Sequence, residues 1–98
     1  MSSGTLVIRS RARQDILRAA KWYEQCQGGL GTAFIKQVGA TIQSIEDNSP
    51  LYPVAYRNLR RALLRRFPYA VFYLVEKSGV SVVAVFGCKQ DQTHLKIR

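Results

Sequence analysis

The apolar segment Tyr69–Glu76, YAVFYLVE, constrains the fold of this chain more than any other feature. It is almost wholly apolar and rich in aromatic and branched side chains, which is typical of a strand buried on both faces. Lys77-Ser78-Gly79 follows as a turn signal, and Val80–Phe86, VSVVAVF, returns with the same character. The two runs predict a buried β-hairpin around which the other elements must pack.

Two amphipathic helices are predicted ahead of this hairpin. Apolar residues recur at helical spacing through Arg11–Gln27, and the Ser10 hydroxyl is expected to cap that helix. The glycines of Gly28–Gly31 interrupt the pattern, which resumes from about Thr32 to Asp47 and stops at Asn48-Ser49-Pro50. Two such helices joined by a short glycine turn predict a helical hairpin.

The remaining segments complete the expected order. Thr5–Arg9 is a branched run that predicts a first strand, and Leu59–Phe67 predicts another before the hairpin. Leu51–Asn58 is expected to be a loop, because its prolines disfavour helix. The order β-α-α-β-β-β predicts one α+β domain over residues 1–98, with the helices packed on one face of the sheet.

The net charge indicates an anionic partner but does not show which kind. Fifteen Lys and Arg residues face six Asp and Glu, a net charge of +9, which attracts phosphates, acidic protein segments and anionic membrane surfaces. The sequence contains no apolar stretch of about 20 residues, so no membrane-spanning helix is predicted. Met1–Gly4 lacks the pattern of a secretory signal, so we expect a cytoplasmic protein.

Metal and cofactor chemistry is not predicted. Cys26 and Cys88 lie far apart and match no metal or redox spacing, and His94 is the only histidine. The chain also lacks a glycine-rich phosphate loop and a convincing carboxylate pair. We expect no metal and no cofactor.

The segment Arg57–Arg66, hereafter the arginine segment, is the main candidate site. Its five arginines are Arg57, Arg60, Arg61, Arg65 and Arg66. Strand alternation would put Arg60 and Arg66 on one face and Arg61 and Arg65 on the other. Their guanidinium groups could bind phosphates or carboxylates through two parallel hydrogen bonds. Alternatively, their charge could keep a solvated edge strand from pairing with a strand of another molecule. The absence of acidic residues between Asp47 and Glu76 favours the anion site.

Several motifs resemble those of one protein family. They are a first strand ending in Arg9, Asp15-Ile16 in the first helix, the Gly28–Gly31 turn before Phe34, and above all RALLRRFPYAVFY at Arg61–Tyr73. From about Leu6 to Asp91 the chain resembles the RelE/ParE toxins of bacterial type II toxin–antitoxin systems. The resemblance implies a helical hairpin on a small, mainly antiparallel sheet.

The resemblance also implies a function. Such a toxin belongs to a plasmid-stabilisation module and is neutralised by a cognate antitoxin whose acidic, amphipathic C-terminal segment wraps it. ParE-like members bind DNA gyrase and block it without chemistry of their own, whereas RelE-like members cut mRNA in the ribosomal A site. Whether this chain is an enzyme is therefore open at this point.

The residues favour the ParE-like side. Cleavage through the RNA 2′-OH requires a base, an acid and cations around the phosphate. The candidates for a nuclease would be Arg61, Arg65, Lys89 and His94. Leu51–Arg60 carries no lysine, Gly87 stands where many members have His, and Gln90-Asp91-Gln92 replaces Arg-Asp-Pro.

Basic residues are the predicted binding surface in either case. The positions expected to contact the target or the antitoxin are Arg57, Arg60, Arg61, Arg65, Arg66, Lys89 and Arg98.

Overall fold

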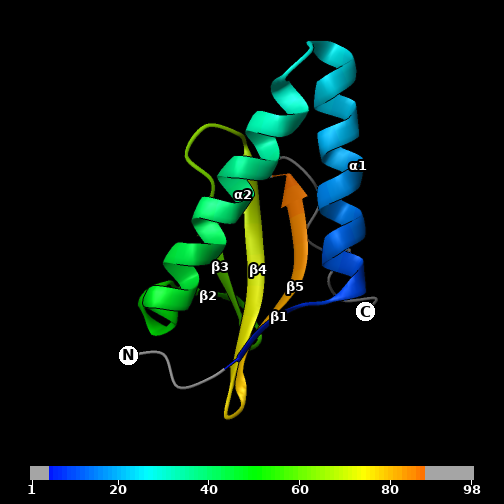
Figure 1. The fold of residues 1–98 in the computed structure, drawn as a ribbon. Coiled ribbons are helices and arrows are strands. Elements are labelled where there is room, and N and C mark those ends of the chain that lie inside the picture. Colours follow the sequence, from blue (N-terminus) through cyan, green and yellow to red (C-terminus); the bar gives the residue numbers. More distant parts are fainter. Residues whose placement is uncertain (1–4, 88–98) are drawn as a thin grey trace.

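The computed structural model describes residues 5–87 and confirms the α+β class (Figure 1). Helices and strands follow one another as the order of the sequence patterns predicts, with one short strand added. The elements are β1 (Thr5–Ile8), α1 (Ser10–Cys26), α2 (Leu30–Asp47), the short 3-10 helix η1 (Ser49–Leu51), β2 (Val54–Tyr56), β3 (Leu59–Leu63), β4 (Tyr69–Glu76) and β5 (Gly79–Gly87).

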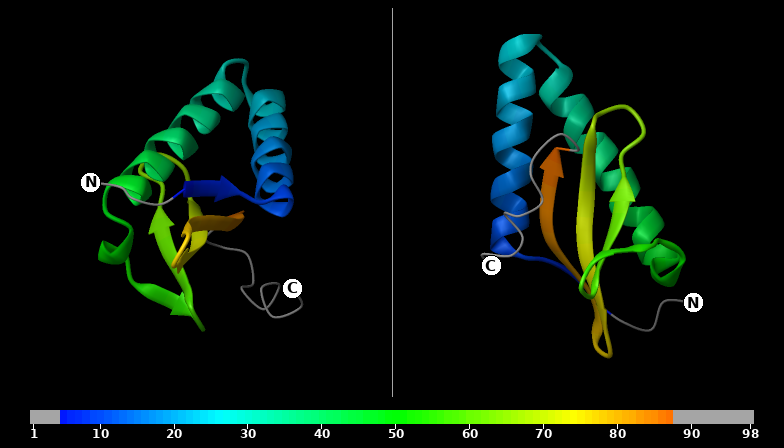
Figure 2. Two further views of the ribbon diagram at one scale, coloured as in Figure 1. Left: turned by 60° about the horizontal axis from the view of Figure 1, so that its bottom comes forward. Right: turned by 180° about the vertical axis from the view of Figure 1, so that it is seen from behind.

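The five strands form a single sheet in the order β1-β5-β4-β3-β2. β1 pairs with β5 in parallel, Thr5 opposite Gly79, and the other neighbours are antiparallel. The sheet is therefore mainly antiparallel, as predicted. Both helices lie on one of its faces, and β3, β4 and β5 come to the front when the molecule is seen from behind (Figure 2).

The main core lies between the helices and the sheet. Four rings from α1, α2, the β3–β4 turn and the start of β4 meet there, with centroids 4.8 Å apart for Tyr23–Phe67, 5.1 Å for Phe34–Tyr69 and 5.3 Å for Phe34–Phe67. Edge-to-face pairs of this kind add to the free energy of burying the rings. This cluster fixes the upper part of the helical hairpin against β4.

The opposite face of the sheet carries a smaller apolar cluster of Ala70, Phe72, Ala84 and Phe86. β4 is thus buried on both faces, as its composition predicted. The register shifts within β4–β5, since Phe72 pairs with Ala84 while Tyr73 pairs with Val82. This bulge lets Val82 join the main core although Ala84 belongs to the other face.

The two helices are joined through a carboxylate. Glu24 of α1 accepts hydrogen bonds from the amides of Gly29, at 3.0 Å, and Gly31, at 2.9 Å, and so caps α2. A Cβ on Gly31 would lie 2.7 Å from the Ala20 carbonyl oxygen, so only glycine fits at this crossing. Gly31 was expected to interrupt the helices, but it lies within α2.

The predicted Ser10 cap is wrong. Ser10 is the first residue of α1, and Arg9 occupies the capping position without a side-chain hydrogen bond to the helix end. The Arg9 amide donates to the Val82 carbonyl at 3.0 Å, which continues the ladder of β1 and β5. The chain therefore stays extended through Arg9, and the helix starts immediately after it.

The predicted strand Leu59–Phe67 ends at Leu63. Pro68 has no amide hydrogen for a ladder, and a turn forms in which the Leu64 amide donates to the Tyr69 carbonyl at 2.9 Å. Phe67 consequently returns to the helix-covered core instead of lying on the opposite face.

The predicted loop Leu51–Asn58 contains structure of its own. η1 begins this connection, and β2 adds an edge strand that pairs with β3, Val54 opposite Arg60. Among the described residues, no helix is both long and apolar enough to cross a membrane.

Candidate functional site

The arginine segment does not form one cluster, because its residues lie in three places. Arg57 lies in the β2–β3 turn, Arg60 and Arg61 lie within β3, and Arg65 and Arg66 lie in the turn after it. Between those two turns β3 runs for about 13 Å, at about 3.3 Å per residue. The strand therefore separates the two ends of the segment.

Arg60 is held by the fold itself. It pairs with Tyr73 on β4, and its guanidinium donates to the carbonyls of Pro50, at 3.2 Å, and Tyr52. Because these carbonyls belong to the connection between α2 and β2, Arg60 ties that connection to the sheet. Its predicted role as a binding residue competes with this structural one.

The other arginines of the segment present their charge outward. Arg61 is half-buried and pairs with Phe72, which places it on the face without helices. Arg57 is exposed and its Nε donates to the Tyr56 hydroxyl at 3.1 Å, while Arg65 and Arg66 are exposed in their turn. Within residues 5–87, none of these side chains forms an ion pair.

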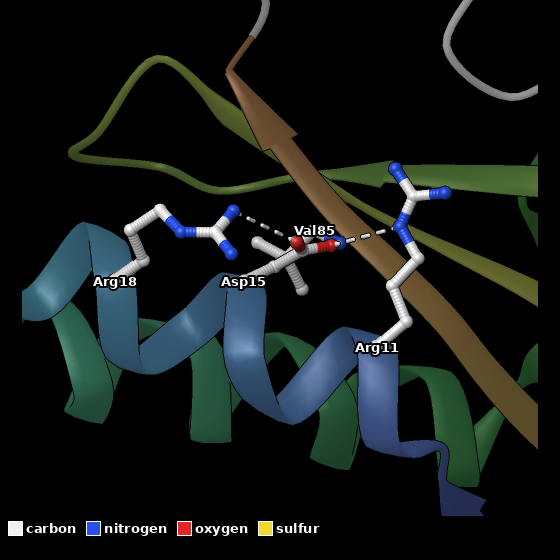
Figure 3. A network of polar contacts seen from close by, with 4 residues as sticks. All are labelled: Arg11, Asp15, Arg18 and Val85. Atoms are coloured by element: carbon white, nitrogen blue, oxygen red, sulfur yellow. Dashed lines mark hydrogen bonds and ion pairs between the residues drawn. The ribbon is translucent and has the colours of Figure 1, made fainter.

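A second arginine site, which the sequence patterns did not single out, lies on α1. Asp15 is 8% exposed, and its carboxylate accepts a hydrogen bond from the Val85 amide at 3.0 Å. Arg11 lies 3.7 Å and Arg18 3.8 Å from its oxygens (Figure 3). The buried charge is compensated on both sides, and the carboxylate fastens α1 to β5.

Beside this carboxylate the surface is hollowed by a pocket of about 300 Å³, hereafter the α1 groove. It lies between α1 and the neighbouring strands, and most of its lining is apolar. The groove is lined by Asp15, Arg18, Ala19, Trp22, Tyr69, Val85 and Phe86. Trp22 is 58% exposed and its ring meets that of Tyr23 edge-on, with centroids 5.0 Å apart.

Three tyrosines keep their hydroxyl protons near neutral pH. Burial raises the pKa of Tyr23 and of Tyr69. Burial also raises the pKa of Tyr73 to about 12, although the Arg60 charge acts in the opposite direction. These groups therefore offer hydrogen-bond donors, and they do not supply a general base.

Metal ligands do not gather in the part of the chain that the structure describes. No group of three or more His, Cys, Asp or Glu side chains could hold an ion among residues 5–87, and Cys26 is an exposed free thiol. The candidates Lys89, His94 and Arg98 lie outside the described residues, as does Cys88.

Comparison with known families settles the kind of protein. The family model for the ParE toxin of the type II toxin–antitoxin system, parDE, matches residues 6–92. The chain belongs to the ParE toxin family. The expected RelE/ParE resemblance is thereby confirmed, on the ParE side.

The ParE fold is also found in a solved structure. A chain described as the chromosomal ParDE TA system from P. aeruginosa matches with a TM-score of 0.79 at 12% sequence identity, over 89% of this chain and 98% of that one. An identity this low establishes the fold alone. A comparison with curated protein sequences found no match.

This ParE-family chain thus carries arginines in two surface regions of different build. The arginine segment presents dispersed cations along and around β3. The α1 groove combines an apolar hollow with the exposed guanidinium of Arg18 on its rim.

Proposed function

We propose that this chain is the toxin of a type II module that stabilises a plasmid, and that it acts by binding DNA gyrase in the cytoplasm. The observation that carries the proposal is the ParE family match over residues 6–92. The resemblance to ParE-like toxins implies inhibition by binding, without chemistry on a substrate.

The spread of the arginines supports binding over cleavage. A nuclease needs a base, an acid and cations around a single phosphate. Here Arg60 is bonded to carbonyls on the helix side, Arg61 lies on the opposite face, and Arg65 lies beyond the end of β3. Separated cations of this kind suit a broad acidic surface better than one reacting group.

The same surface supports an acidic, amphipathic antitoxin segment as the neutralising partner. Arg57, Arg61 and Arg65 supply charge, and none of them forms an ion pair within residues 5–87. Leu63 between them is 58% exposed, so it supplies an apolar contact. Opposite charge on the partner would accelerate association and exclude basic competitors.

A supercoiling assay tests the target directly. The purified chain is titrated into DNA gyrase acting on relaxed plasmid, and we expect supercoiling to stop as the dose rises. Addition of the antitoxin should restore it.

Mapping of transcript 5′ ends after induction of the chain in bacteria separates the alternatives. Growth arrest without new ends supports the gyrase proposal. New cuts at fixed codon positions in translated messages would replace it with the ribosome-dependent nuclease, and normal growth would indicate an inactive toxin.

A further inference from the structure

Three arginines follow β3 from one end to the other. Arg57 lies in the turn before β3, Arg61 lies on the sheet face without helices, and Arg65 lies in the turn after β3. When the molecule is seen from behind, as in Figure 2, β3 comes to the front. We propose that these three arginines, hereafter the β3 row, bind the phosphate backbone of duplex DNA. The inference goes beyond the proposed function, because this binding requires neither gyrase nor an antitoxin.

The β3 row keeps its charge within the described residues. The ion pairs of residues 5–87 involve Arg9, Arg11 and Arg18, all outside the row. A guanidinium without a carboxylate partner can bind a phosphate through two parallel hydrogen bonds. The whole chain carries a net charge of +9, which attracts a polyanion from a distance. The row therefore offers phosphate ligands on a chain that nucleic acid attracts.

The backbone of Arg57 indicates that its side chain has a function. Tyr56 pairs with Leu59, which leaves a two-residue turn between β2 and β3. Arg57 is the first residue of that turn and has a φ of 50°. Turns of this length favour glycine or asparagine at positive φ, because a larger side chain crowds the backbone there. Residues in such costly conformations occur preferentially at functional sites, so the side chain accounts for the arginine.

Tyr56 holds the Arg57 side chain in place. The guanidinium carbon lies 5.5 Å from the centroid of the Tyr56 ring, and Nε donates to the Tyr56 hydroxyl at 3.1 Å. This leaves the two terminal nitrogens of the guanidinium for a phosphate. A side chain that is already ordered loses less conformational entropy when it binds. Arg57 is therefore a prepared phosphate ligand at the tip of the β2–β3 hairpin.

The spacing of the β3 row matches a groove of duplex DNA. β3 spans about 13 Å between its two turns, at about 3.3 Å per residue. The major groove of B-DNA is about 12 Å wide, whereas the minor groove is about 6 Å wide. Arg57 and Arg65 lie beyond the two ends of β3, so they are placed to meet phosphates of opposite strands, with Arg61 between them. Contacts of this kind position a protein on DNA without reading its sequence.

The aromatic residues of the same sheet face argue against a single-stranded ligand. Proteins that bind single strands stack the bases on accessible aromatic rings. Phe72 is 1% exposed and Phe86 is 8% exposed, so neither offers its ring to a base. The half-buried ring of Tyr56 is in contact with the Arg57 guanidinium. Backbone contacts to a duplex are therefore favoured over stacking on the bases of an RNA.

Fluorescence anisotropy tests the proposal with the purified chain and nucleic acid alone. The probe is a fluorescein-labelled DNA duplex of about 20 base pairs, and a labelled single-stranded RNA of the same length is the comparison. We expect the chain to bind the duplex more tightly than the RNA, with an affinity that falls steeply as salt rises. Tighter binding of the RNA, or no binding of the duplex at about 50 mM salt, would overturn the proposal.

Substitutions show whether the β3 row, and not net charge alone, binds the duplex. We expect about threefold to tenfold weaker binding, and a slope of log affinity against log salt that is lower by about 0.9, for each of Arg57→Ala, Arg61→Ala and Arg65→Ala. The controls remove the same charge from exposed positions on the two helices and should bind within about twofold of the original; they are Lys21→Ala and Lys36→Ala. Equal losses in all the variants would reduce the binding to general charge attraction and overturn the site.

Arg57→Gly separates DNA binding from stability. Glycine adopts a positive φ without strain, so this variant should denature at a urea concentration no lower than the original does. It should nevertheless bind the duplex about threefold to tenfold more weakly, because the phosphate ligand is gone. A clear loss of stability together with unchanged DNA binding would give Arg57 a structural role only and overturn the proposal.

Discussion

Arginine side chains lie beside the α1 groove and along the arginine segment, but their surroundings differ between the two regions. Beside the groove, Arg11 and Arg18 flank the buried carboxylate of Asp15, so the charges help to join α1 to β5. In the arginine segment only Arg60 is fixed, by backbone carbonyls, and the others face outward. The comparison shows that the acceptors within reach decide whether an arginine stabilises the fold or remains available to a partner.

The largest effect is expected for Asp15→Ala. The change would leave the buried Val85 amide without its acceptor and two guanidiniums without their counter-charge, which should lower the free energy of unfolding by about 3 kcal/mol. Urea denaturation measures it. Asp47→Ala, at an exposed carboxylate, should stay within about 0.5 kcal/mol. Equal losses for the two variants would refute the structural role given to Asp15.

Arg60→Ala should have the next largest effect. Losing two charge-assisted hydrogen bonds to the Pro50 and Tyr52 carbonyls should cost about 1–2 kcal/mol of stability, discounted because the guanidinium is only partly buried. Arg65→Ala is the matched control, because its side chain is exposed. If both variants denature at the same urea concentration, Arg60 does not hold the connection after α2.

Tyr73→Phe should lower stability by about 1 kcal/mol near neutral pH, because the Tyr73 hydroxyl donates to the Ser49 carbonyl at 2.7 Å. Burial raises the folded pKa of Tyr73 from 10.0 to about 12, so the unfolded chain loses this proton first as the pH rises. Stability should therefore fall between about pH 10 and pH 12.

The slope of stability against pH shows whether Tyr73 causes the loss. The Tyr73→Phe protein should lose stability less steeply over the same pH range, with a remainder from Tyr23 and Tyr69, whose pKa values are also raised. Thermal unfolding recorded across the range measures both slopes. Identical slopes would remove Tyr73 from the explanation.

The smallest change in stability is expected for Arg61→Ala and Arg65→Ala, within about 0.5 kcal/mol, because neither side chain forms an ion pair within the described residues. Both variants should nevertheless weaken gyrase inhibition, and the difference from the original should shrink as salt is added. Lys77→Ala in the β4–β5 turn is the control. Unchanged inhibition would take the arginine segment out of the target interface.

The sequence predicted the long, periodic elements well. The β4–β5 hairpin and both helices have apolar patterns that local physics converts directly into structure. The sequence patterns did not predict the short strand β2. It is a three-residue edge strand next to Pro53, and its pairing with β3 depends on a turn at Arg57. β2 is a strand because it pairs with β3, and its own sequence does not indicate that pairing.

The site was less predictable for a related reason. Counting arginines suggested one cluster, but the end of β3 at Leu63 places Arg65 and Arg66 in a turn, outside the strand alternation. The α1 groove depends on Asp15 meeting an amide seventy residues away, which no local pattern contains. Composition likewise does not distinguish an exposed tryptophan such as Trp22 from a buried one.

The parallel pairing of β1 with β5 sets the point in synthesis at which the sheet can be completed. Thr5 leaves the ribosome long before its partner Gly79 exists, and translation adds about 5–20 residues per second. The sheet can close only after β5 has emerged, because contacts between distant segments form late. The nascent chain therefore lacks its finished sheet surface for most of its translation.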